Sequence, residues 1–366
     1  MIKSSLTLSK SVFVLFLSFL VIFGLYFARE FLIPISISTL LAMLFVPVSH
    51  WLESKGISRL FAGVFCVLLF LLCVASVIGL LAWQAKGISN DLHEIIFRIE
   101  QIADNIREFI ARNIGISSEK QKQWMSKQTT GTSGTLGLAG VLLSSVMNII
   151  VHFILVIVYL FLFIYYRSHL KKFILMLVPA SANPEAEKII LDSGKVAQKY
   201  LSGLSSMIVI LWIMYSVGFS IAGVKSAIFF AILCGLLEIL PFIGNLTGTF
   251  ITVLAVMSQG GSDGMIIGVV ITYLLIQFIQ TYFLEPLIVG SEVNINPLFT
   301  ILIIVFMEIV WGISGMILAI PMLGIVKIIC DHVTPLKPYG FLIGRSRSDK
   351  KQGIHRKLQN WLGLNN

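Results

Sequence analysis

The fold of this chain is decided by the stretch Gly235-Leu-Leu-Glu238-Ile-Leu-Pro241-Phe-Ile-Gly244-Asn245-Leu-Thr-Gly248, which lies inside an apolar run over residues 226–257. A carboxylate, a proline and three glycines interrupt that run, and hydrocarbon cannot hydrogen-bond a broken helix backbone. Such a break therefore lies against protein or beside water, and an ionisable group at that depth indicates a functional site. A second apolar run, over residues 297–329, carries its own interruptions, which are Glu308, Gly312, Gly315 and Pro321. We interpret the two runs as a pair.

The composition is typical of a membrane protein. Of the 366 residues, 57% are hydrophobic and 12% are charged, and the mean hydropathy is +0.93. Soluble domains carry about 25% charged residues, and uncharged runs of about 17 or more residues recur along this chain. The sequence therefore predicts an all-α integral membrane protein, a multi-span helical bundle with about eight hydrophobic segments. The four cysteines fall in or beside apolar segments without metal-ligand spacing, and we interpret them as packing residues.

Changes in composition divide the chain into five regions. Residues 1–83 hold three predicted spans, and the first span resembles a signal peptide that lacks a cleavage site. Residues 84–140 form a polar insertion with an a/d heptad pattern from Ile88 to Phe109. Residues 141–204 hold the fourth span and an amphipathic helix, beginning at Asn183, that we expect along the cytoplasmic membrane surface. Residues 205–330 hold the predicted transport core, and residues 331–366 form a polar, basic tail.

The heptad pattern of the insertion leaves a narrow apolar seam that needs a partner. Two partners are open: the insertion's own hairpin, and a second copy of the chain.

The placement of the basic residues predicts the orientation. With the N-terminus inside, most of the 27 Lys and Arg residues fall in cytoplasmic segments, so both termini are predicted to be cytoplasmic and the insertion extracytoplasmic. In this topology the fifth span is followed by the first interrupted run, and the sixth span is followed by the second. The two pairs have the same layout but enter the membrane from opposite sides. That layout predicts an inverted repeat, which in secondary transporters meets at a midplane site made of discontinuous helices. Each run is either a helical hairpin or a pair of short spans.

Glu238 is the foremost candidate residue. Pro241 has no backbone N–H, so carbonyl groups of the preceding turn lose their helical hydrogen bonds. We expect these free carbonyl groups and the Glu238 carboxylate together to bind a cation or a proton. Alternatively, the carboxylate caps the second half of the broken run. Gly244 and Asn245 would allow the backbone to approach a substrate closely. Gln277 and Gln280 either line a polar path or bond to a neighbouring helix. The full set of candidate substrate-binding or ion-binding residues is Glu238, Pro241, Gly244, Asn245, Glu285, Pro286, Glu308, Gly312, Gly315 and Pro321.

Motifs for enzymes are absent from the sequence. It holds no Walker motif, no G-x-S-x-G and no H-E-x-x-H, so we expect neither an enzyme nor an ATPase, and no cofactor or metal site. The basic tail follows a membrane segment, which favours contact with anionic lipid over nucleic acid.

Three motifs, in order along the chain, resemble those of the AI-2E family of transporters, a family of permeases. Residues 238–244 (Glu-Ile-Leu-Pro-Phe-Ile-Gly) resemble its E-x-x-P-x-x-G stretch, and residues 284–297 resemble a second signature that ends in proline. Residues 311–321 (Trp-Gly-Ile-Ser-Gly-Met-Ile-Leu-Ala-Ile-Pro) resemble its closing G-x-x-G-x-x-x-A-x-P. Where many members have small residues before Trp-Gly, this chain has Met307-Glu308-Ile-Val, and the added carboxylate favours a cation-coupled or proton-coupled mechanism.

The resemblance implies a carrier of the bacterial inner membrane that forms homo-oligomers, with a pentamer as one assembly. It also implies a small-molecule or cation substrate, because the family is associated with export of the quorum signal autoinducer-2 and some members resemble sodium/proton antiporters. The sequence therefore predicts an ion-coupled secondary transporter in which Glu238, with Glu308, binds the coupling ion between the two interrupted runs. Two alternatives are a monovalent cation (Na⁺/Li⁺)/proton antiporter and a non-transporting membrane scaffold organised by the heptads.

Overall fold

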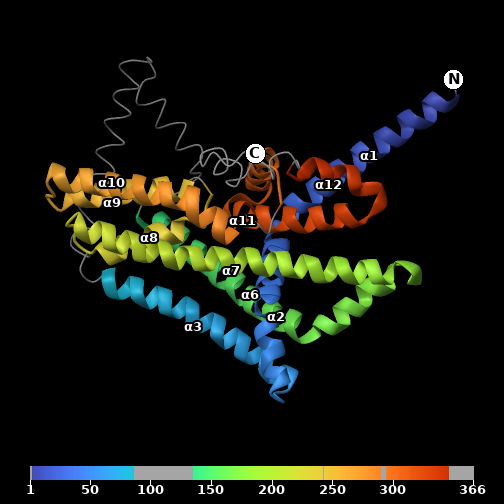
Figure 1. Cartoon of the computed structure of the whole chain (residues 1–366), viewed down its shortest axis with the longest axis horizontal. Coiled ribbons are helices and arrows are strands. Elements are labelled where there is room, and N and C mark those ends of the chain that lie inside the picture. Colours follow the sequence, from blue (N-terminus) through green and yellow to red (C-terminus); the bar gives the residue numbers. More distant parts are fainter. Residues whose placement is uncertain (1, 86–134, 242, 290–293, 346–366) are drawn as a thin grey trace, which may run out of the picture. The chain divides into compact units, whose positions relative to one another are not determined.

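The computed structural model describes residues 2–85, 135–241, 243–289 and 294–345 (Figure 1). Within these ranges the chain is helical and has no strand beyond an isolated antiparallel bridge between Ile295 and Gly344. The prediction of an all-α multi-span protein is confirmed, since six of the described helices are long and apolar enough to cross a membrane. The predicted heptad helix over residues 88–109 and the tail beyond residue 345 lie outside the described residues.

The helices follow one another along the chain with short connections. Those before the first interrupted run are α1 (Ile2–Phe27), α2 (Arg29–Ser54), α3 (Arg59–Ala85), α6 (Thr135–Met176) and α7 (Asn183–Ile221). Those that follow are α8 (Ala227–Leu237), α9 (Ile243–Ser258), α10 (Asp263–Ile279), a π-helical segment (Gln280–Val289), α11 (Pro297–His332) and α12 (Lys337–Ile343). Two single turns of 3₁₀ helix, Ala180–Ala182 and Thr334–Leu336, precede α7 and α12.

The chain forms two compact units. The first comprises Met1–Leu69, Leu155–Ser206 and Leu284–Asn366, and the second comprises Phe70–Ile154 and Met207–Phe283. Residues of the predicted transport core, 205–330, therefore occur in both units.

The helix α7 is continuous from Asn183 to Ile221. At 1.5 Å per residue its 39 residues span roughly 58 Å, about twice the ~30 Å hydrocarbon core. The predicted amphipathic helix and the fifth span are thus one element, because no proline follows Pro184 of the first turn, and isolated glycines such as Gly194 and Gly203 lower helix stability without ending the helix.

The core of the first unit lies where α11 meets α2 and α7. Its buried residues are Leu40, Ala197, Ile304, Met307, Val310, Trp311, Met316, Leu318 and Ala319. The indole N–H of Trp311 donates to the carbonyl of Leu25 in α1 at 2.9 Å, which ties α11 to α1 beside the break in α11. At the other end of α11, α12 folds back beside it, and Ile343 packs with Ile295 and Leu323 (Figure 1). The beginning of the predicted tail is therefore folded.

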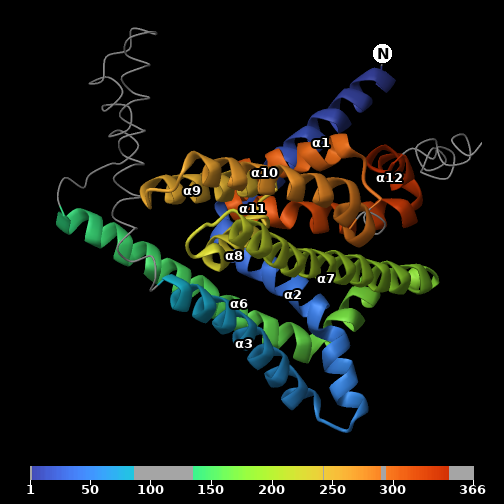
Figure 2. The same cartoon turned by 60° about the vertical axis from the view of Figure 1, so that its left-hand side comes forward.

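The helices α2 and α3 form a hairpin whose turn contains Gly56 at φ 87°, and α6 runs along α3 (Figure 2). A Cβ atom at Gly63 of α3 would lie 3.3 Å from the Phe161 ring of α6, so the small residue permits close contact between the two helices. Ser38 of α2 donates to the carbonyl of Val156 in α6 at 3.0 Å. Among the cysteines, Cys66, Cys234 and Cys330 are buried, whereas Cys73 is exposed and is not the packing residue that we expect from the sequence.

The first interrupted run is a helical hairpin in the second unit. Its halves, α8 and α9, span roughly 16 Å and 24 Å, and neither reaches across ~30 Å of hydrocarbon. They pack against each other at Gly244 and Gly248, where added Cβ atoms would lie 1.6 Å from the Leu237 carbonyl oxygen and 2.9 Å from the Cys234 sulfur. Gly244 therefore permits a close approach to α8, and its role in binding a substrate stays a prediction.

The second interrupted run breaks at a single residue of the first unit, Gly312. Its φ of 62° and ψ of −144° lie in a region that essentially only glycine adopts. After the break the chain packs back on itself, since a Cβ atom at Gly315 would lie 2.0 Å from the Met307 carbonyl oxygen. The helix continues past Pro321, which is buried and does not interrupt it. Both predicted interruptions are thus confirmed, whereas the opposite orientation of the two hairpins stays a prediction.

Candidate functional site

The π-helical segment follows α10 directly and begins at Gln280. From the sequence, the sixth span is predicted over about residues 265–284 and to end at Glu285-Pro286, but the helix continues to Val289 with a wider turn. Turns of π-helix are rare in proteins and frequently occur at functional sites. Gln280 lies where the helix widens, and its side chain bonds to the break of the first hairpin.

Glu238 is the first residue after α8 and is half-buried. Its Oε1 accepts a hydrogen bond of 2.5 Å from Nε2 of Gln280, whose residue surface is only 1% exposed. Of the two interpretations of Gln280, the structure shows the bond to a neighbouring element. The capping role of Glu238 stays a prediction. Pro241 lies three residues later in the same break, where its carbonyl accepts from the backbone N–H of Ile243 at 2.8 Å.

A chain of hydrogen bonds links four further polar side chains of the second unit. Tyr215 of α7 donates its hydroxyl to Oδ1 of the buried Asn245 at 2.8 Å, and Nδ2 of Asn245 donates to Oε1 of Gln277. Nε2 of Gln277 then donates to the hydroxyl of Thr281 at 3.2 Å. Each amide accepts at its oxygen and donates from its nitrogen, so the bonds point in one direction and polarise one another.

We call these six residues, namely Tyr215, Glu238, Asn245, Gln277, Gln280 and Thr281, the polar cluster. They come from α7, the hairpin break, α9, α10 and the π-helical segment, and all belong to the second unit. The described part of the chain has no group of three His, Cys, Asp or Glu side chains that could hold a metal ion. One carboxylate among amide and hydroxyl groups suits a proton, a monovalent cation or a small polar solute.

The remaining predicted site residues belong to the first unit. Glu308 is exposed, and its neighbours Val305 and Ile309 are exposed and apolar. Glu285 is also exposed and is followed by Pro286 within the π-helical segment. In the second hairpin, Gly312 forms the break, Gly315 lies against the backbone of Met307, and Pro321 lies buried within the helix. The structure therefore brings Glu238 and Asn245 into one region, and the pairing of Glu238 with Glu308 stays a prediction.

The sequence does not reveal two members of the polar cluster, Tyr215 and Thr281. Tyr215 is one of three aromatic residues in the span of residues 205–223, with Trp212 and Phe219, and its side chain is fully buried. A buried tyrosine hydroxyl usually finds a hydrogen-bond partner, and this rule is the one signal that could have indicated it. The partner itself, Asn245, is 30 positions away along the chain.

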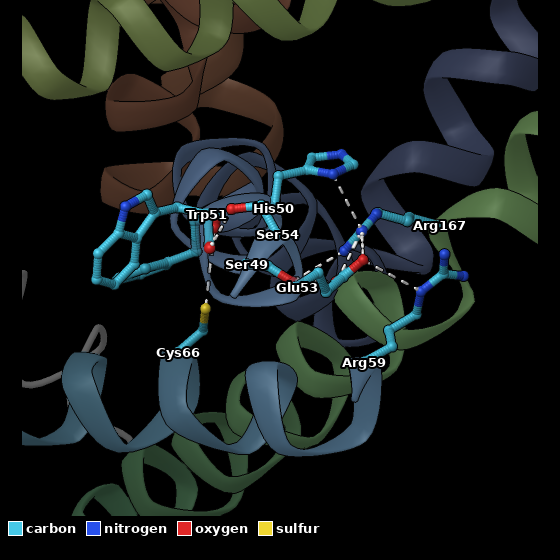
Figure 3. A network of polar contacts seen from close by, with 9 residues as sticks. Ser49, His50, Trp51, Glu53, Ser54, Arg59, Cys66 and Arg167 are labelled. Atoms are coloured by element: carbon cyan, nitrogen blue, oxygen red, sulfur yellow. Dashed lines mark hydrogen bonds and ion pairs between the residues drawn. The ribbon is translucent and has the colours of Figure 1, made fainter. Parts of the chain in front are cut away.

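A second polar cluster joins α2, α3 and α6 in the first unit (Figure 3). Nη2 of Arg167 donates to both carboxylate oxygens of Glu53, at 2.8 Å and 2.6 Å, and Nη1 donates to the Ser49 hydroxyl at 2.9 Å. Nε of Arg59 lies 3.9 Å from the same carboxylate. The side chains of Arg167 and Glu53 are only 13% and 21% exposed, so this charge-assisted contact is shielded from water. It joins the end of α2 and the beginning of α3 to α6.

Comparisons with known proteins identify the family of the chain. The profile described as AI-2E family transporter matches residues 15–334. YrrI of Bacillus subtilis, named as a candidate transport protein, is 24% identical over 322 residues, which cover 83% of this chain and 87% of the relative. MT0215 of Mycobacterium tuberculosis, also named as a candidate transport protein, is 24% identical over 305 residues, or 79% of each chain. PerM of Escherichia coli, named as a candidate permease, is 24% identical over 321 residues, which cover 86% of this chain and 90% of the relative. The resemblance found in three motifs is thereby confirmed, and the chain belongs to the AI-2E transporter family.

Proposed function

We propose that this chain is a secondary transporter in which Glu238 binds the coupling proton or Na⁺. The observation that carries the proposal is the contact between Glu238, at the break of the first hairpin, and the fully buried amide of Gln280. A carboxylate within an apolar hairpin is costly, and such groups are retained where they bind ions or relay protons. Membership in a transporter family supports a transport function, and it agrees with the prediction that the chain is not an enzyme.

The cargo that we propose first is a small solute, with export of autoinducer-2 as the form that the family suggests. The relatives YrrI and PerM are named for transport and permease functions, without a substrate. The polar cluster offers amide and hydroxyl groups as donors and acceptors, and such groups suit a neutral polyhydroxylated solute.

A second candidate function is the exchange of monovalent cations for protons. It is favoured by Glu308, a carboxylate in an otherwise apolar half of the second hairpin, since carboxylate and amide oxygens are the ligands that hard cations prefer. In this form Glu308 acts with Glu238, and the cation itself is the cargo.

The further features of the proposal follow from the sequence. We propose that both termini are cytoplasmic in the bacterial inner membrane, as the distribution of Lys and Arg favours. We also propose a homo-oligomer, as the family resemblance implies, with anionic lipid beside the basic tail.

Reconstitution of the full chain in liposomes separates the two functions. Export predicts efflux of preloaded autoinducer-2, and exchange predicts a change of internal pH on addition of Na⁺ without any organic solute. Liposomes without protein and liposomes with the Glu238→Gln variant are the controls. If neither flux exceeds that of the empty liposomes at any pH, the proposal of a transporter coupled at Glu238 is wrong.

A further inference from the structure

The amide of Gln280 is only half used in the structure. Its Nε2 donates to Glu238, whereas its Oε1 is buried and accepts no hydrogen bond from the described part of the chain. The whole residue is 1% exposed, so water cannot reach this oxygen from the surface in this conformation. A buried acceptor without a donor is unfavourable, and in native proteins such a group needs an explanation.

The protonation state of Glu238 provides that explanation. An ionised carboxylate only accepts hydrogen bonds, whereas a carboxylic acid also has one O–H group that donates. A glutamine amide has both a donor and an acceptor, and half a turn about its Cγ–Cδ bond exchanges their positions. Gln280 can therefore face either form of the Glu238 side chain.

We propose that Gln280 is the positioning residue that satisfies Glu238 in both protonation states. Its Nε2 donates to the carboxylate, and after the amide turns, its Oε1 accepts from the carboxylic acid. The proton comes from water and stays on the Glu238 carboxyl group, while the amide keeps both of its own protons. The inference rests on the proposed function, because it requires that Glu238 bind a proton.

The neighbouring Gln277 cannot serve in this way. It already accepts from Asn245 and donates to Thr281, so turning its amide would break two hydrogen bonds at once. Gln277 and Gln280 are of the same residue type, lie three positions apart and both bond to parts of the first hairpin. Gln277 is therefore the matched control for Gln280.

Infrared difference spectra between acidic and alkaline buffer test the inference on the full-length protein in liposomes. The band of the protonated carboxyl group that disappears in Glu238→Gln identifies Glu238. We expect this band to move to higher wavenumber in Gln280→Met, because the O–H group loses its acceptor, and to stay in place in Gln277→Met. Gln280→Asn, whose amide is one methylene shorter, should show the same shift and serves if the methionine variant is not recovered from membranes.

Two different results would overturn the inference, and they have different consequences. An unmoved band in both Gln280 variants would show that Gln280 does not accept the proton of Glu238, and the proposed transporter would remain. A spectrum in which no band depends on Glu238 would show that this residue binds no proton, and the proposed proton coupling would fall together with the role of Gln280. A purely structural role of Gln280 would lower the protein yield without moving the band.

Discussion

The substitution Gly244→Ala should open the first hairpin. In the structure, α8 and α9 approach so closely at this point that an added Cβ atom would lie 1.6 Å from the carbonyl oxygen of Leu237 and 2.4 Å from its carbonyl carbon. These are backbone atoms, so no side chain can turn aside to make room, and the two helices have to separate. Overpacking of this kind typically costs about 1–3 kcal/mol, and we expect the upper half of that range.

Cys234 reports this opening directly, because it lies on α8 against Gly248 and its residue surface is 0% exposed. In a chain whose other cysteines are replaced, a thiol reagent reaches Cys234 only when the hairpin opens locally. A loss of about 2–3 kcal/mol corresponds to labelling that is roughly 30- to 140-fold faster. Labelling is followed on the purified protein in detergent and in liposomes.

The control is Gly79→Ala in α3, where nothing lies within 4 Å of the added Cβ atom. Alanine favours a helix over glycine by up to about 1 kcal/mol, so this variant should be neutral or slightly stabilised and should leave the labelling of Cys234 unchanged. If Gly244→Ala labels at the wild-type rate, α8 and α9 are not packed as the structure shows, and the reasoning about the hairpin is refuted.

Two further experiments test the second hairpin and the second polar cluster. Gly312→Ala should lower the free energy of unfolding by about 1–3 kcal/mol, which is measured as a lower thermal midpoint. Nothing lies within 4 Å of the added Cβ atom, so the loss comes from the backbone conformation alone. An unchanged midpoint would exclude the break at this residue. In a double-mutant cycle, Glu53→Gln and Arg167→Met should show a coupling free energy of about 1–3 kcal/mol, because the contact is shielded from water. Strictly additive effects of the two substitutions would mean that the two side chains do not interact in solution.

The two breaks differ in how well the sequence predicts them. The first is predictable to within a few residues, because a carboxylate and a proline three positions apart are together unfavourable in a plain helix in hydrocarbon. In the second run, Gly312, Gly315 and Pro321 are equally suspect from residue type alone. The structure distinguishes them: Gly312 adopts a positive φ, Gly315 lies against a neighbouring backbone, and Pro321 is accommodated within the helix.

The polar cluster shows the same limit. The sequence places Glu238 and Asn245 near the break, and it marks Gln277 and Gln280 as polar residues of an apolar span. Which side chains meet depends on the rotation of α9 and α10 about their axes and on the wider turn at Gln280, and neither is encoded in a local pattern. A one-dimensional pattern identifies polar groups, whereas their pairing requires the packed helices.

Transport by the Glu238→Gln variant tests the proposed role of Glu238 most directly. The amide has nearly the size of the carboxyl group but binds no proton at physiological pH, so insertion into the membrane should match that of the wild type. Efflux of autoinducer-2 and Na⁺-driven proton movement are measured in liposomes over a series of pH values with equal amounts of each protein. We expect the variant to lose transport or to lose its dependence on pH, whereas wild-type rates with the wild-type pH dependence would contradict a coupling ion at Glu238.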